Sequence, residues 1–240
     1  MILSQIDNSG KVGFNFYHRD RKGARVSRDF IEKLFVNMVK KSTIYFDETD
    51  NDHIFTYREK QLHTVICPSI EMITPRFVIE LPITRKPAGD EEYQGNVDYW
   101  ISYRNYTFLL ELKHTFFAYK NPGQPHRYIR SKFKDAKKQL ENIRIKECRR
   151  LADNKGTIKI ALEVIVFYET SKKEISNIES DDYTYSNLLD NMIKNAELEN
   201  EISFSAIWEL DHRLTEPFEF ENINERFPAV GCIGYISKKF

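Results

Sequence analysis

The sequence predicts an α/β fold with a mixed central sheet, helices packed against it and a C-terminal α/β extension. Two segments repeat apolar residues at helical spacing, and the segments around them alternate apolar and polar residues as strands do. No internal repeat, low-complexity tract or Ser/Gly-rich linker divides the 240 residues. Because a chain of this length can bury one core, we expect a single domain over 1–240, with a core at about 29–169 and an extension at 170–240.

The first predicted element is a helix over residues 28–41. Apolar side chains recur there every three or four residues, and Asp29 lies in the first turn. The following segment, 62–85, is rich in apolar and β-branched residues and is interrupted by three prolines. This composition predicts two short strands with bends.

A hairpin is predicted next, from strands over 97–104 and 106–119 with Asn105 in the turn. Residues 127–153 then repeat apolar positions at spacings of three and four, which predicts one long amphipathic helix. Residues 157–170 alternate as a strand that is expected to join the sheet. The extension is predicted to hold a helix around 185–199 and strands at 202–211 and 230–238.

Charge and cysteine content limit the classes of protein. The 36 basic and 36 acidic residues balance, so a polyanion site has to be local. Two basic stretches qualify, one over 18–28 and one from His126 to Arg150. The alternative is a solvated helix face. Three cysteines without C-x-x-C spacing fit neither a disulfide framework nor a structural zinc site. With no secretion or membrane signal in the sequence, we expect a cytoplasmic protein that is not associated with a membrane.

Two charged residues interrupt the second hairpin strand, which otherwise has the composition of a buried strand. In FLLELKHTF the two-residue period directs Glu111 and Lys113 to one face and the flanking leucines to the other. Burial of either charge alone would cost several kcal/mol, so the pair needs mutual contact, solvent or a cation. Asp98 on the partner strand can bring a second carboxylate to the same place.

Two carboxylates beside a lysine suit a hard cation. Mg²⁺, or Mn²⁺ in its place, prefers oxygen ligands and is usually held by one or two carboxylates together with water and substrate phosphate. Asp98 and Glu111 would supply the carboxylates, and the backbone carbonyl of Leu112 a third oxygen. Lys113 would position or deprotonate the attacking water, or offset charge in the transition state. The chemistry this predicts is phosphodiester hydrolysis.

The residues VDYW and LLELKH together resemble the bipartite signature of the PD-(D/E)xK nuclease superfamily. Asp98 matches its first acidic position, Glu111 its second and Lys113 its lysine. The resemblance covers about 29–169 and implies a restriction-endonuclease-like core of helix, three strands, helix and strand. It further implies a magnesium-dependent deoxyribonuclease that acts on DNA, with a homodimer as an additional expectation.

Two further site residues follow from the resemblance alone. Glu32 stands on the first helix, where many members of the superfamily carry an extra metal-binding acid. Gln139 resembles the catalytic helix glutamine of the RecB-like exonuclease branch, although Ile143 stands where that branch has tyrosine.

Three alternatives to a nuclease remain open. Glu111 and Lys113 could form an ordinary ion pair on a half-exposed edge strand. The chain could be an inactive nuclease-fold protein that serves as a nucleic-acid-binding or assembly module. It could also be an enzyme of another class that uses Glu111 or Lys113 in acid–base work.

Overall fold

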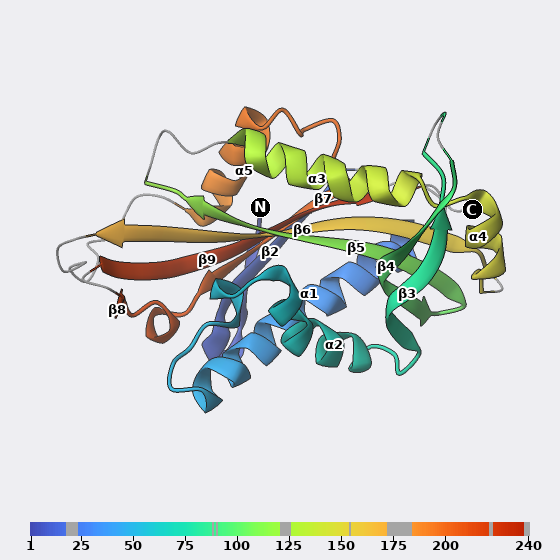
Figure 1. The fold of residues 1–240 in the computed structure, drawn as a ribbon. Coiled ribbons are helices and arrows are strands. Elements are labelled where there is room, and N and C mark those ends of the chain that lie inside the picture. Colours follow the sequence, from blue (N-terminus) through green and yellow to red (C-terminus); the bar gives the residue numbers. More distant parts are fainter. Residues whose placement is uncertain are drawn as a thin grey trace.

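A computed structural model describes residues 1–17, 24–87, 89, 91–120, 126–153, 155–171, 184–220 and 223–237. The chain forms an α/β structure around one largely antiparallel sheet (Figure 1), which confirms the predicted α/β class with a mixed sheet. The described strands are β1 (Leu3–Ile6), β2 (Gly10–Phe16), β3 (Phe77–Arg85), β4 (Tyr93–Tyr103), β5 (Tyr106–Ala118), β6 (Thr157–Ser171), β7 (Phe204–Leu210), β8 (Phe218–Phe220) and β9 (Ile223–Ile236). The described α-helices are α1 (Ala24–Glu48), α2 (His63–Glu71), α3 (His126–Glu141), α4 (Ile145–Arg150) and α5 (Tyr185–Asn195).

The strands lie in the order β1-β2-β7-β9-β6-β5-β4-β3, and β8 pairs with β9 outside this row. The pair β5–β6 is parallel, and the chain crosses between these strands through α3 and α4. The other pairs are antiparallel. Strands β7 and β9, from the predicted extension, lie between β2 and β6, so residues after 170 build the middle of the same sheet.

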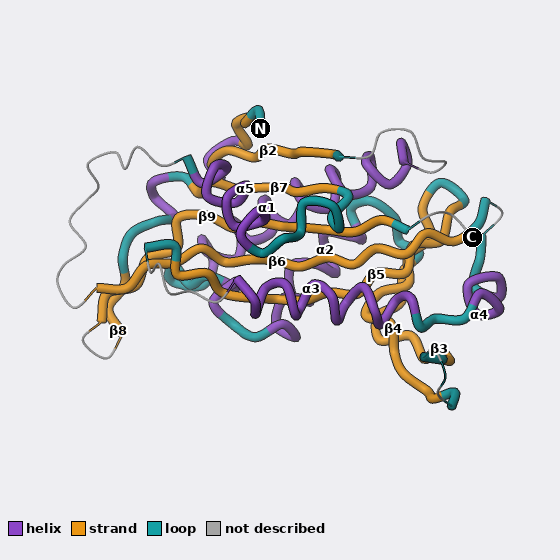
Figure 2. Tube along the Cα trace, turned by 90° about the horizontal axis from the view of Figure 1, so that it is seen from above, coloured by secondary structure: helices purple, strands orange, loops and turns teal. Residues whose placement is uncertain are grey.

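Helices cover both faces of the sheet (Figures 1 and 2). Helices α1 and α2 pack on one face, where Phe30 of α1 stacks on Phe108 of β5 at 4.7 Å between ring centroids. Helices α3 and α5 cover the opposite face. Because helices cover the sheet on both sides, both faces of β6 are buried along most of its length.

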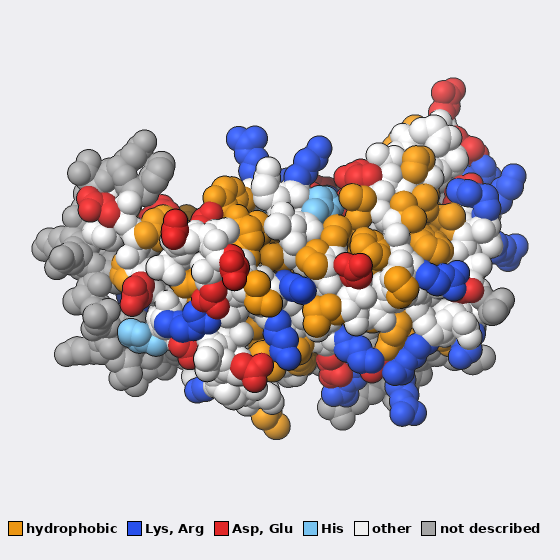
Figure 3. Space-filling view, turned by 90° about the horizontal axis from the view of Figure 1, so that it is seen from below, with side chains coloured by type: hydrophobic (Ala, Val, Ile, Leu, Met, Phe, Trp, Pro, Cys, Tyr) orange, Lys and Arg blue, Asp and Glu red, His pale blue; other side chains and the backbone are white. Residues whose placement is uncertain are grey.

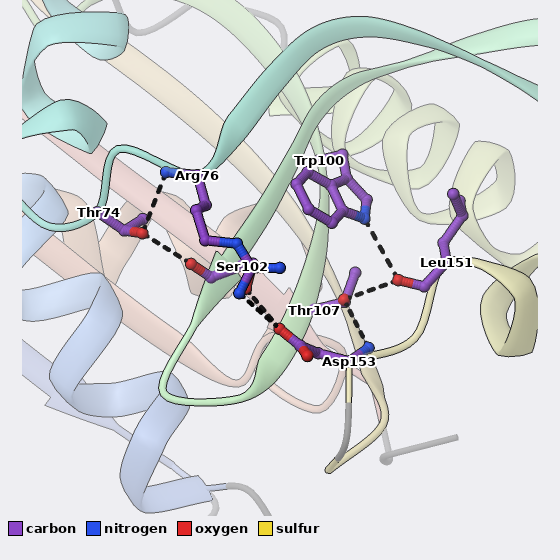
Figure 4. A network of polar contacts seen from close by, with 7 residues as sticks. All are labelled: Thr74, Arg76, Trp100, Ser102, Thr107, Leu151 and Asp153. Carbon is purple, nitrogen blue, oxygen red and sulfur yellow. Dashed lines mark hydrogen bonds and ion pairs between the residues drawn. The ribbon is translucent and has the colours of Figure 1, made fainter.

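The predicted hairpin is confirmed as β4 and β5. Arg104 and Asn105 connect the strands with φ values of 49° and 65°, the left-handed conformation that a two-residue hairpin turn requires. A polar network fastens the turn end of the hairpin to the segment before β6 (Figure 4). The Asp153 carboxylate accepts from Ser102 Oγ at 2.5 Å, and the Leu151 carbonyl accepts from Thr107 Oγ1 at 2.9 Å. This network fixes the strands that carry the candidate site.

The first of the two strands predicted within 62–85 is wrong, because residues 63–71 form helix α2. Val65, Ile66, Ser69 and Ile70 are its buried positions, at helical spacing, and the helix packs on α1. Pro68 is accommodated inside this short helix, with the loss of one backbone hydrogen bond. The second predicted strand is confirmed as β3.

The predicted long helix over 127–153 is divided. Helix α3 ends at Glu141, and α4 starts again at Ile145. Between them Ile143 forms a β-bridge with Arg85, and the Lys86 amide donates to the Asn142 carbonyl at 2.7 Å. The helix breaks here because backbone groups of residues 142 and 143 bond to the end of β3 instead of continuing the helical hydrogen bonds.

The strands predicted at 157–170 and 202–211 are confirmed as β6 and β7. The last predicted strand, 230–238, is confirmed as part of β9, which begins earlier at Ile223, and Lys238 lies outside the described residues. The helix predicted around 185–199 is confirmed as α5, which ends at Asn195. None of the described helices is long and apolar enough to cross a bilayer. On the face that carries α1 and α2, basic and acidic side chains are interspersed over the described part (Figure 3).

Candidate active site

Strands β4 and β5 separate at the candidate site. Their ladder runs from Tyr103↔Tyr106 to Tyr99↔Leu110 and stops there, directly before Asp98 and Glu111. Beyond this point β4 continues with β3 alone, from Leu81↔Val97 to Arg85↔Tyr93. We call the point of separation the fork, and residues 80–87 and 91–97 of this two-stranded extension the arm.

The fork leaves both backbone polar groups of Leu112 without a strand partner on the β4 side, and side chains take their place. Asp98 Oδ2 accepts from the Leu112 amide at 2.7 Å. Lys113 Nζ donates to the Leu112 carbonyl at 2.9 Å. Because buried backbone groups need partners, these two contacts hold Asp98 and Lys113 at the fork.

Glu111 and Lys113 lie on one face of β5, as predicted. Leu110 and Leu112 belong to the core under α1, whereas Leu109, two residues before Glu111, belongs to the core under α3. Glu111 is only 2% exposed. The site therefore lies on the α3 face of the sheet, below the surface.

Arg85, at the end of β3, forms a buried ion pair with Glu111. The same guanidinium donates to the Gln139 carbonyl of α3 at 2.5 Å and to the Asn96 carbonyl of the arm. Gly95 makes room for this side chain, because a Cβ at that position would lie 3.0 Å from Arg85 Nε. Arg85 thus joins the arm, β5 and α3 at the fork.

Burial and neighbouring charges change the acidity of Glu111 at the fork. Burial, and then the nearby negative charge of Asp98, raise the pKa of Glu111 to about 8 even though Arg85 and Lys113 oppose the shift. A carboxyl group in this state takes up a proton or a cation readily.

Glu59, in a 3-10 turn over Glu59–Leu62, is a third carboxylate close to the site. It lies 3.8 Å from Lys113 Nζ, with its side chain 41% exposed. Burial raises its pKa, and Asp98 adds to the shift while Lys113 opposes it. Glu59 is therefore the carboxylate that lies next to the Lys113 ammonium group.

A pocket of about 500 Å³ opens beside Lys113, between the arm and α3. Gln139 lines it together with Glu59, so the structure brings this predicted residue to the site.

Glu32 is not brought to the site. It forms an exposed ion pair with Arg28 at 2.9 Å, and it lines a different pocket together with Val12 and Phe14 of β2. That pocket lies at the β1–β2 edge, and four strands separate β2 from β4 in the sheet order. Helix α1 also packs on the face opposite α3. Glu32 therefore cannot share an ion with Asp98.

The donor set at the fork suits one hard cation. Asp98 and Glu111 offer carboxylate oxygens, and Leu112 offers a carbonyl oxygen, which are the ligand types of Mg²⁺ and Mn²⁺. Within the described residues no group of three or more His, Cys, Asp or Glu has the arrangement of a metal site. A cation here would therefore complete its coordination with water and substrate oxygens, as Mg²⁺ commonly does.

Sequence patterns did not identify Arg85, Glu59 or Tyr93, which also lines the pocket. Arg85 gave one weak signal, since it is a charged residue at the end of an apolar strand. Glu59 gave none, because its turn follows no periodicity and lies far from β5 in the sequence.

In comparisons with known proteins, no family model, curated protein or solved structure matches this chain. The function of the site has to be inferred from its geometry and chemistry.

Proposed function

We propose that this protein is a metal-dependent nuclease that hydrolyses phosphodiester bonds in DNA. The observation that carries the proposal is the convergence at the fork: Asp98 and Lys113 hold the two backbone groups of Leu112, and Glu111 extends from the same strand as Lys113. Two carboxylates, a carbonyl and an amine thus belong to residues at the fork, and Lys113 lines an open pocket.

The order of elements supports the same proposal. Helix α1, strands β3, β4 and β5, helix α3 and strand β6 follow one another as in a restriction-endonuclease-like core, with α2 inserted after the first helix. The three strands form an antiparallel meander, and β6 pairs parallel with β5.

Each residue has a role in the proposed reaction. Asp98, Glu111 and the Leu112 carbonyl would hold Mg²⁺ or Mn²⁺. Bound there, the cation would polarise the phosphate and lower the pKa of a water molecule. Lys113 Nζ would orient that water or offset charge on the phosphate oxygens. The Gln139 side chain, at the pocket wall, would position the substrate. Arg85 stays on Glu111 and keeps it in place.

The test is cleavage of single-stranded, duplex and branched DNA with Mg²⁺ and with chelator. We expect magnesium-dependent cleavage by the wild type and its loss in Asp98→Asn. Glu32→Gln is the matched control, because it also neutralises a carboxylate, but at the far edge of the sheet. Cleavage that survives chelation or Asp98→Asn would refute the proposal.

A second candidate is a catalytically inactive module that binds nucleic acid or assembles with other proteins. The ion pair of Arg85 with Glu111 favours it, because this carboxylate already has a cationic partner. Calorimetry separates the two: Mn²⁺ binding that is weakened by Glu111→Gln supports the nuclease. Absence of such binding supports the inactive module.

A further inference from the structure

The basic residues of helix α3 fall into two groups, one in ion pairs within the protein and one at the pocket. Arg130, Lys134 and Lys137, spaced by four and three residues, form ion pairs with acidic residues of the segment between α5 and β7. Arg130 pairs with Glu197, and both lysines pair with Glu201, at 3.0 and 3.5 Å. This row of α3 is largely neutralised within the protein.

Lys132 and Lys138 lie outside this row of α3 and line the pocket beside Lys113. Within the described part of the chain neither lysine forms an ion pair; Lys132 lies over the Tyr128 ring instead, at 5.4 Å. Together with Lys113, three lysines therefore line one pocket. Glu59 and Asp135 are the acidic residues of its lining, and the excess of positive charge favours an anionic ligand.

The opposite wall of the pocket is the arm, which contributes Pro87 and Tyr93. The Tyr93 ring lies above Gly95, next to Arg85, and the residue is 44% exposed. An exposed ring on the wall of a basic pocket is the combination by which proteins bind unpaired bases: the ring stacks on the base while cations contact the backbone.

The arm cannot move freely away from α3. The Ile143 bridge, the bond from the Lys86 amide to the Asn142 carbonyl and the Arg144–Glu92 ion pair tie it to the segment after the helix. The pocket is thus preformed. At about 500 Å³ it has the size that encloses a small ligand, about one nucleotide, and is too small for a duplex.

The burial of the reactive groups is a second reason why the site favours a single strand over a duplex. Glu111 is 2% exposed, and the Lys113 side chain is 14% exposed. Lys113 lines the pocket between the arm and α3, so a phosphate that enters this pocket can reach the lysine. We infer that the pocket binds an unpaired DNA strand, with one base stacked on Tyr93 and the adjoining phosphates held by Lys113, Lys132 and Lys138. This inference rests on the proposed function, since the phosphate at Lys113 is the one to be cut.

Fluorescence anisotropy with labelled oligonucleotides in chelator tests the inference without cleavage. The probes are an oligo-dT strand, a strand of the same length with abasic sites and a matched blunt duplex. We expect the oligo-dT strand to bind at least about tenfold more tightly than the duplex, and Tyr93→Leu to weaken strand binding about tenfold, as loss of one stacked base predicts. Tyr93→Phe should retain binding, and the abasic strand should not distinguish wild type from Tyr93→Leu.

Lysine variants supply matched controls on the same helix. Lys132→Ala should weaken strand binding and reduce its salt dependence, whereas Lys134→Ala, which removes an ion-paired lysine, should change it less than about twofold. Equal binding of strand and duplex, no effect of Tyr93→Leu, or equal effects of the two lysine variants would each overturn the inference.

Cleavage of the same probes with Mg²⁺ separates this inference from the proposed function. If duplex is cut in an Asp98-dependent way and Tyr93→Leu has no effect on any probe, the nuclease stands and the single-strand pocket fails. If strand binding depends on Tyr93 but no probe is cut, the pocket stands and the nuclease fails.

Discussion

Arg85 on β3 reaches past β4 to form a buried ion pair with Glu111 on β5, and the two side chains are 4% and 2% exposed. The pair occupies the gap that opens where β4 leaves β5. Whether the fork serves catalysis or only structure, this contact determines how Glu111 is held.

Replacement of Arg85 should lower the stability of the folded protein. Arg85→Met leaves a carboxylate buried without its partner, and we expect the free energy of unfolding to fall by about 3 kcal/mol. Glu111→Gln in the same chain should recover part of this loss, because no buried charge then remains. Urea unfolding of the two single variants and the double variant measures the coupling. Strict additivity of the single effects would contradict a direct interaction.

Gly95 should be required for this placement of Arg85. A Cβ there would lie 3.0 Å from Arg85 Nε and 3.3 Å from Cδ, so Gly95→Ala forces the guanidinium to shift. We expect a loss of about 1–2 kcal/mol in the free energy of unfolding, as for other overpacked sites. In the Arg85→Met background the same change should cost less, since the long side chain is gone. An equal cost in both backgrounds would show that Arg85 is not the obstacle.

The buried carboxyl of Glu163 on β6 predicts a pH-dependent stability. Burial raises its pKa to about 8, although the hydrogen bond from Thr115 Oγ1 opposes the shift. The folded protein then keeps a proton that the unfolded chain, with an ordinary glutamate pKa near 4.5, releases. The free energy of unfolding should therefore fall as the pH rises from about 4.5 to 8 and level off above that range.

Glu163→Gln tests this origin of the pH dependence. The amide of the variant cannot ionise. Between low and high pH, its free energy of unfolding should therefore fall by up to about 5 kcal/mol less than that of the wild type. Urea midpoints at about pH 5 and pH 9 make the comparison. Glu111, whose pKa is also raised to about 8, contributes a decrease of the same sign and remains in both proteins. Parallel profiles for the two proteins would rule out Glu163.

Substitutions of Lys113 and of Asp98 should differ in their effect on metal binding. Lys113→Ala removes the group that acts on water or phosphate, so we expect at least a 100-fold loss of kcat, about the effect of a missing proton-transfer or charge-stabilising group. Its Mn²⁺ affinity, measured by calorimetry, should stay close to that of the wild type, because the carboxylates remain. Asp98→Ala should lose both activity and Mn²⁺ binding. Loss of Mn²⁺ binding in Lys113→Ala would contradict the assigned roles.

Local periodicity was sufficient to predict much of the fold and the face of β5 on which the candidate residues Glu111 and Lys113 lie. The alternation in FLLELKHTF predicts the face on which Glu111 and Lys113 lie, and the helical spacing at 28–41 predicts α1, because both patterns depend on neighbours two to four residues away. The same patterns were misleading at 63–71, where apolar β-branched residues suit a strand or a helix, and contact with α1 decided for the helix.

The amino-acid sequence by itself determined the hairpin, the strand at 157–170 and the common face of Glu111 and Lys113. Only the tertiary structure decided that Arg85 and Glu59 lie beside them, that Glu32 lies at the opposite edge of the sheet and that the helix after β5 stops at Glu141. The physical reason is range: side-chain direction within one strand follows from backbone geometry alone. Contacts between residues tens of positions apart depend instead on how complete helices and strands pack, which no local spacing specifies.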